Sequence, residues 1–90
     1  LVGTWRMTAY KNGQAVDFTM TINKKGKVNF TAPSENIDFT TTCTTKNGRV
    51  TFDKYLTPTA GTYSFIYERE KETIRLYSTK NAQQLWAWKK

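Results

Sequence analysis

The sequence predicts an all-β domain, a single small antiparallel up-and-down β-barrel of about eight short strands in a meander. Three observations lead to this fold class. Ninety residues allow one domain, spanning 1–90. Thr is the most frequent residue, and Thr and aromatic side chains suit a pleated, half-buried surface. Turn signals also recur at intervals of about 11 residues, as in all-β sandwiches and barrels.

Seven turns are expected, and they separate eight segments. Asn-Gly pairs supply the positive φ angles that tight hairpins require. The turns are Asn12-Gly13, Lys24-Lys25-Gly26, Pro33-Ser34-Glu35-Asn36, Lys46-Asn47-Gly48, Thr57-Pro58-Thr59-Ala60-Gly61, Arg69-Glu70-Lys71-Glu72 and Lys80-Asn81-Ala82.

The segments between the turns alternate between apolar and polar residues with a period of two, which indicates one buried and one wet face. The apolar faces are Trp5, Met7 and Ala9; Val16, Phe18, Met20 and Ile22; Val28 and Phe30; Ile37, Phe39, Thr41 and Cys43; Val50 and Phe52; and Ile74 and Leu76. A short helix around 53–60 is the one place where helical structure is expected. Short connections force neighbouring strands to pair antiparallel, and closing the meander into a barrel removes two exposed edges.

Composition excludes several classes of function. The chain has no His, which is the commonest general base and a frequent zinc ligand, so we expect no enzyme, no metal site and no cofactor. A single Cys cannot form an internal disulfide, and Cys43 is expected to be a buried, inert thiol. No apolar run is long enough to span a membrane as a helix. The net charge of +7 is scattered over turns, including Lys24, Lys25 and Lys27, and indicates solubility more than a specific partner.

The opening residues Leu1-Val2-Gly3-Thr4-Trp5 resemble the Gly-x-Trp signature of lipocalins and related calycin barrels. Together with the closing strand Leu85-Trp86-Ala87-Trp88, the layout is similar to short lipocalin-like domains of bacterial secreted proteins and lipoproteins. The chain is shorter than true lipocalins and lacks the disulfides and C-terminal helix that they often carry. The resemblance implies an extracytoplasmic location (periplasmic, surface lipoprotein or secreted). If the protein is a surface lipoprotein, its lipid anchor is expected upstream of Leu1.

A physical reason for the Gly-x-Trp pattern can be given. Trp5 is expected to seal one end of the barrel, and Gly3 lets the chain pass close beneath the indole. The resemblance further implies that a basic side chain of the last strand, Lys89 or Lys90, stacks over Trp5.

Two candidate sites follow. The barrel interior is one, because eight strands enclose just enough space for their own side chains or for one small ligand. Its expected lining is Trp5, Met20, Phe30, Phe39, Tyr63 and Tyr67. The other is an aromatic partner surface formed by Tyr10, Tyr77, Trp86 and Trp88, for which packing at the barrel end is the alternative.

The leading hypothesis is therefore a non-catalytic extracytoplasmic binding module that carries a small apolar ligand in the barrel. The alternative is a protein-interaction or inhibitor domain that acts through its outer surface and loops around a filled interior. A nucleic-acid-binding barrel is a third hypothesis, which the sequence disfavours because most aromatic residues alternate inward and no recognition motif is present. Spaced carboxylates at Glu68, Glu70 and Glu72 are expected to be solvated charges at a hairpin.

Overall fold

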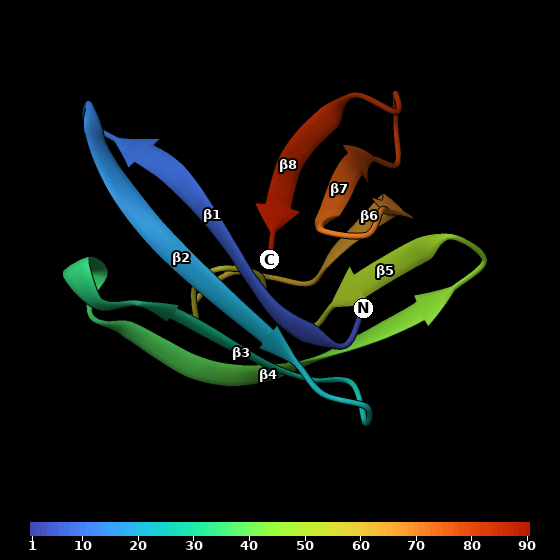
Figure 1. The fold of residues 1–90 in the computed structure, drawn as a ribbon, viewed down its shortest axis with the longest axis horizontal. Coiled ribbons are helices and arrows are strands. Elements are labelled where there is room, and N and C mark those ends of the chain that lie inside the picture. The colour runs from blue at the N-terminus through green and yellow to red at the C-terminus, as the bar shows by residue number, and fades with distance from the viewer.

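The computed structural model describes all residues from Leu1 to Lys90 and shows a closed barrel with strand order β1-β2-β3-β4-β5-β6-β7-β8 (Figure 1). Every pair of neighbouring strands is antiparallel, so the predicted up-and-down barrel is confirmed. The strands are β1 (Gly3–Lys11), β2 (Gln14–Ile22), β3 (Lys27–Ala32), β4 (Ile37–Lys46), β5 (Arg49–Phe52), β6 (Tyr63–Arg69), β7 (Thr73–Ser78) and β8 (Gln84–Lys89). A 3₁₀ helix, Pro33–Glu35, connects β3 to β4.

Two-residue turns set the register of two hairpins. Asn12 and Gly13 have φ angles of 51° and 79° between β1 and β2, and Asn47 and Gly48 have 53° and 75° between β4 and β5. Positive φ at both central residues matches the right-handed twist of the flanking strands, so the hairpins close without splaying. The β1–β2 ladder then runs from Lys11 paired with Gln14 to Gly3 paired with Ile22.

Gly26 positions the β2–β3 turn against β4. Its carbonyl accepts a 2.8 Å hydrogen bond from the Cys43 amide. A Cβ at this position, where φ is +82°, would lie 2.6 Å from the Cys43 carbonyl oxygen. Only glycine therefore allows both this backbone conformation and this close approach.

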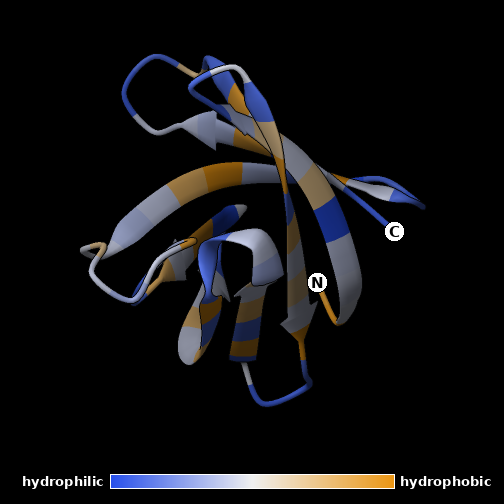
Figure 2. Ribbon diagram, turned by 90° about the vertical axis from the view of Figure 1, so that its left-hand side faces the viewer, coloured by the Kyte–Doolittle hydropathy of each residue, from blue (hydrophilic) through white to orange (hydrophobic).

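The core lies inside the barrel and follows the predicted alternation. On β2, for example, Val16, Phe18, Met20 and Ile22 are buried. Figure 2 shows orange and blue bands alternating along the strands, as expected for one apolar and one polar face. The largest fully buried side chains are Trp5, Trp88, Phe30, Phe52, Met20, Ile74, Leu76, Val28 and Val50.

The prediction of a short helix around 53–60 is wrong. Residues 53–62, here called the mouth loop, consist of bends, turns and irregular backbone without a helix. Asp53 donates its amide to the Thr42 carbonyl at 2.9 Å, and the Lys54 amide donates to Thr41 Oγ1 at 3.1 Å. These bonds hold the start of the loop along β4, and Pro58 lacks the amide that a continuing helix would need. The loop instead folds over one end of the barrel.

That end of the barrel, the mouth, is bordered by the β1–β2 turn, the 3₁₀ helix, the mouth loop and the β7–β8 turn. The other end, the closed end, carries the β2–β3, β4–β5 and β6–β7 turns and both chain ends. The barrel is joined at a narrow seam, because β1 and β8 pair only at Arg6 and Lys89.

Candidate functional site

Trp5 seals the closed end of the barrel. Its side chain is fully buried, and the indole Nε1 donates a 3.0 Å hydrogen bond to the Leu1 carbonyl. The Lys90 Nζ lies 5.1 Å and the Arg69 guanidinium carbon 5.2 Å from the ring centroid, so two cations stack on one indole. The stacking expected of Lys89 or Lys90 is thus made by Lys90.

Gly3 makes this seal possible. It has a φ of +143°, and a Cβ there would lie 3.1 Å from Lys90 Cε and 3.6 Å from Trp5 Nε1. A larger residue would be strained by this positive φ and would require the Lys90 side chain to shift by a few tenths of an ångström. The closed end is therefore built for closure, and ligand access must be sought at the mouth.

The predicted interior residues form a packed core. Trp5, Met20 and Phe30 are buried as expected, and Phe39 and Tyr67 are partly buried and pack against the core. None of these five lines any of the main hollows of the molecule. Their role in ligand binding stays a prediction, and the interior that they occupy is filled by their own side chains.

Tyr63 departs from its expected place. It has the inward parity of β6, but it is 50% exposed because it lies at the rim, where the barrel opens. Its ring stacks on Phe65, with the centroids 6.1 Å apart.

Tyr55 of the mouth loop was not found by the sequence analysis, although it is the central residue of this end. It is 4% exposed, and its ring lies among six other aromatic rings contributed by four strands. The centroid distances are 4.9 Å to Phe65, 5.2 Å to Phe52, 5.6 Å to Phe30, 5.6 Å to Trp86, 6.1 Å to Tyr63 and 6.5 Å to Trp88. The one feature of the sequence that could have pointed to Tyr55 is that it is an aromatic residue in a stretch otherwise typical of turns. Tyr55 plugs the barrel from above.

The Tyr55 hydroxyl is held by a buried hydrogen bond. The Trp88 Nε1 donates to this oxygen at 3.1 Å, so two buried polar groups satisfy one another. Burial raises the pKa of the Tyr55 hydroxyl strongly, and the Trp88 hydrogen bond opposes part of that rise. The phenol remains neutral at any physiological pH.

A pocket of about 520 Å³ lies above this plug, and it is the candidate functional site. Its apolar lining comes from the mouth loop, β6 and β8, and its polar rim from β6 and the β7–β8 turn. The lining residues are Tyr55, Leu56, Thr57, Ala60, Tyr63, Ser64, Phe65, Ser78, Thr79, Lys80, Leu85 and Trp86. Lys80 is the one charged residue among them. Leu85 is 49% exposed, so apolar surface is open to an incoming molecule.

A smaller hollow of about 430 Å³ lies on the other side of the mouth loop, beside β1 and β2. Leu56 and Thr57 line both hollows and separate them. Leu56 has a φ of +68°, a conformation that costs a non-glycine residue about 1–3 kcal/mol. The loop is therefore strained at the point where it divides the mouth.

The predicted aromatic partner surface is not a single patch. Trp88 is fully buried beneath Tyr55, so its assignment to the surface is wrong. Trp86 shares the inward face of β8 with Trp88 and lines the mouth pocket. Tyr10 is 77% exposed at the end of β1, and none of the close aromatic contacts joins two of these four residues. Closure of the barrel decided which face of β8 is internal.

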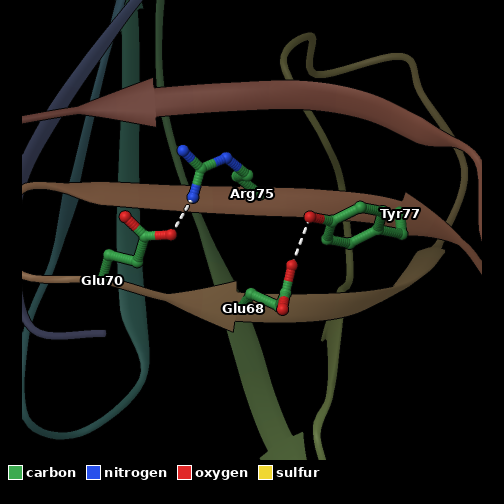
Figure 3. Close-up of polar contacts among 4 residues, drawn as sticks. All are labelled: Glu68, Glu70, Arg75 and Tyr77. Carbon is green, nitrogen blue, oxygen red and sulfur yellow. Dashed lines mark hydrogen bonds and ion pairs between the residues drawn. The ribbon is translucent and has the colours of Figure 1, made fainter.

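Tyr77 lies on the outer face of β7 and donates a hydrogen bond to the Glu68 carboxylate of β6 (Figure 3). This bond is the main reason why the pKa of Tyr77 is raised. On the same face Arg75 forms an ion pair with Glu70. Glu68 and Glu70 thus lie on an exposed hairpin surface, and each has its own partner.

Cys43 is buried as predicted, and desolvation raises the pKa of its thiol. No group of three His, Cys, Asp or Glu side chains is arranged to hold a metal ion. The chain contains no helix of the length and apolarity needed to cross a membrane.

Comparisons of the chain with protein-family models, curated proteins and solved structures find no match. The function is therefore inferred from the mouth of the barrel itself.

Proposed function

We propose that this domain is a non-catalytic binding module that takes a small, largely apolar ligand at the mouth of the barrel. The observation that carries the proposal is the pocket of about 520 Å³ with four aromatic side chains, Tyr55, Tyr63, Phe65 and Trp86, in its wall. Small-molecule sites typically measure about 300–1,000 Å³ and combine an apolar wall with a few polar groups. The proposed site lies between the Tyr55 ring and solvent, whereas the sequence pattern predicted a site inside the barrel, where core side chains now fill the space.

The lining defines the chemistry of the ligand. Aromatic faces favour a flat or branched apolar body, because rings stack and bury large areas. Lys80 supplies a cation at the rim, and the pocket has no carboxylate. A ligand with an apolar body and one anionic or hydrogen-bond-accepting end fits this arrangement best.

The proposal includes the lipocalin-like character and the extracytoplasmic location that the Gly3-Thr4-Trp5 opening implies. The Trp5 seal with its stacked Lys90, and the meander of eight strands, support the first of these. The location rests on the resemblance alone.

A dye titration tests the site. Anilinonaphthalene sulfonate combines an apolar ring system with an anionic group, so it resembles the proposed ligand. We expect saturable one-to-one binding with a blue-shifted emission, while near-ultraviolet circular dichroism shows that the protein stays folded. Leu85→Glu places a like charge beside the sulfonate and removes apolar contact, and we expect it to weaken binding by about tenfold or more.

Val2→Glu is the matched control, because Val2 is also 49% exposed and lies outside the pocket. We expect this variant to change dye affinity by less than about twofold, since its charge is solvated and distant. Absence of saturable binding to the folded protein, or equal weakening by both variants, would refute a ligand site at the mouth.

A second candidate function is a protein-interaction domain that acts through its outer surface and loops. The filled interior favours it, because core side chains leave no enclosed space for a ligand. The same titration separates the two functions. A folded protein that binds no apolar dye would favour the interaction domain.

A further inference from the structure

Five cations lie on two neighbouring turns of the closed end, away from the mouth. Lys24 and Lys25 are in the β2–β3 turn, Lys27 begins β3, and Lys46 and Arg49 flank the β4–β5 turn. All five are exposed, and we refer to them as the basic face. The close approach of Gly26 to Cys43 holds the first turn against β4, the strand that carries Lys46. In Figure 1 the β2–β3 turn projects downward and the β4–β5 turn projects to the right.

Lys46 and Arg49 stand directly opposite one another in the β4–β5 ladder. Like charges in this relationship repel and destabilise a hairpin. They border a hollow of about 620 Å³ whose other lining residues are Thr44, Asn47, Thr51 and Ser64. The hollow thus offers two cations, three hydroxyls and an amide, with no apolar side chain and no carboxylate.

No acidic residue of the chain neutralises the basic face. The two ion pairs of the molecule are Lys11 with Glu35 and Arg75 with Glu70, and neither includes one of the five cations. Glu68 accepts from Tyr77 on the outer surface of β6 and β7 (Figure 3). By contrast, the hollow at the β1–β8 seam, which contains Arg6 and Lys89, also contains the Asp17 carboxylate.

We propose that the basic face docks the domain on an anionic phospholipid surface, with Lys46 and Arg49 at the centre of the contact. Clusters of about 4–8 Lys and Arg side chains bind anionic membranes. The Thr44 hydroxyl and one hydroxyl of the hydrogen-bonded Thr51–Ser64 pair add donors for phosphate oxygens. Flexible lysines on turn tips suit a fluid surface, which needs no exact complementary shape.

Other partners fit the basic face less well. Single-stranded nucleic acids are bound through basic grooves with aromatic side chains on which bases stack, and the five cations and the hollow include no aromatic residue. A stable protein interface needs an apolar or aromatic centre, which is also absent. The charge complementarity therefore favours phosphate headgroups. The mouth pocket opens at the other end of the barrel and shares only Ser64 with this hollow, so docking neither requires nor excludes ligand binding there.

Sedimentation with lipid vesicles tests the proposal. Vesicles of phosphatidylcholine alone are compared with vesicles containing about 30 mol% phosphatidylglycerol, at a low salt concentration of about 0.1 M and a high one of about 1 M. We expect binding to the anionic vesicles only, lost at high salt. Each Lys or Arg at the surface contributes about fivefold, so the double variant K46Q/R49Q is expected to weaken partitioning by about 25-fold.

The double variant K11Q/K54Q is the matched control. It has the same net charge as K46Q/R49Q, but its changes are at the mouth end and outside the lining of the mouth pocket, beyond the Debye length of about 8–10 Å from a membrane at the closed end. We expect it to weaken partitioning by about twofold or less. Equal losses in the two variants would show that net charge alone drives binding and would overturn the proposal.

Two further outcomes would also overturn it. One is the absence of binding to anionic vesicles at low salt. The other is tighter binding of a single-stranded oligonucleotide than of the vesicles, with the same dependence on Lys46 and Arg49. Thermal unfolding of both variants establishes that they are folded, which is expected because none of the four positions is buried.

Discussion

The indole nitrogen of Trp88 donates a 3.1 Å hydrogen bond to the hydroxyl of Tyr55 inside the barrel, across 33 residues of sequence. One partner belongs to the last strand and the other to the mouth loop. The bond therefore ties the loop to the wall of the barrel. It also sets the floor of the mouth pocket, because the Tyr55 ring lies between that pocket and the core.

Tyr55→Phe is expected to reduce the free energy of unfolding by about 1–3 kcal/mol, because the buried Trp88 Nε1 loses its acceptor. Urea unfolding followed by circular dichroism measures this difference. Tyr10→Phe is the control, since Tyr10 is 77% exposed, and its effect should stay within about 0.5 kcal/mol. Unchanged stability in Tyr55→Phe would show that this hydrogen bond does not hold the mouth loop.

The stability of the protein at alkaline pH should depend on Tyr55. Burial raises the pKa of Tyr55 in the folded protein above the value near 10 that the unfolded chain has. Above about pH 10 the unfolded state therefore binds fewer protons than the folded state, and the free energy of unfolding falls as pH rises, by up to about 1.4 kcal/mol per pH unit.

The comparison of wild type with Tyr55→Phe isolates this contribution, because every other titrating group is common to both proteins. Below about pH 10 the free energy of unfolding of the wild type should exceed that of Tyr55→Phe by a constant amount. Above about pH 10 this difference should become smaller. Urea unfolding at several pH values between 8 and 11 makes the measurement. A gap that stays constant to the highest pH would contradict the burial of the Tyr55 hydroxyl.

Gly26→Ala is expected to destabilise the protein more than Gly13→Ala. Both glycines have positive φ, of +82° and +79°, so both variants carry a similar backbone cost. Only at Gly26 would the new Cβ meet another atom, the Cys43 carbonyl oxygen at 2.6 Å, whereas Gly13 has open space. The forced backbone shift is expected to lower the free energy of unfolding of Gly26→Ala by about 1–3 kcal/mol more than that of Gly13→Ala. Thermal unfolding detects this difference as a melting temperature lower by several degrees. Equal melting temperatures would show that the β2–β3 turn moves away from β4 at little cost.

The turns and strands could be predicted because their causes are local. Asn12-Gly13 and Asn47-Gly48 adopt positive φ wherever they occur between two strands, and period-two alternation marks the buried face of each segment. These signals need only a few neighbouring residues. The Gly3-Thr4-Trp5 opening likewise indicated the seal, and Lys90 stacks on Trp5 as one of the two expected cations.

The mouth could not be predicted in the same way. Tyr55 lies in a stretch of turn-forming residues, and its burial depends on rings from β3, β5, β6 and β8 that the chain brings together only on folding. Alternation placed Trp86 and Trp88 on one face of the last strand, but both faces of that strand are apolar. The side that faces inward was decided by closure against β7 and β1.

The sequence by itself thus determined eight antiparallel strands, their turns and most of the core, because short-range turn chemistry and alternation suffice for these. Only the tertiary structure decided that the interior is filled, that Tyr55 plugs it, and that the open pocket lies above the plug. It also decided that Lys46 and Arg49 face each other beside a hollow without a carboxylate. Pockets and charged faces are relations between strands distant in sequence, and they exist only once the barrel has closed.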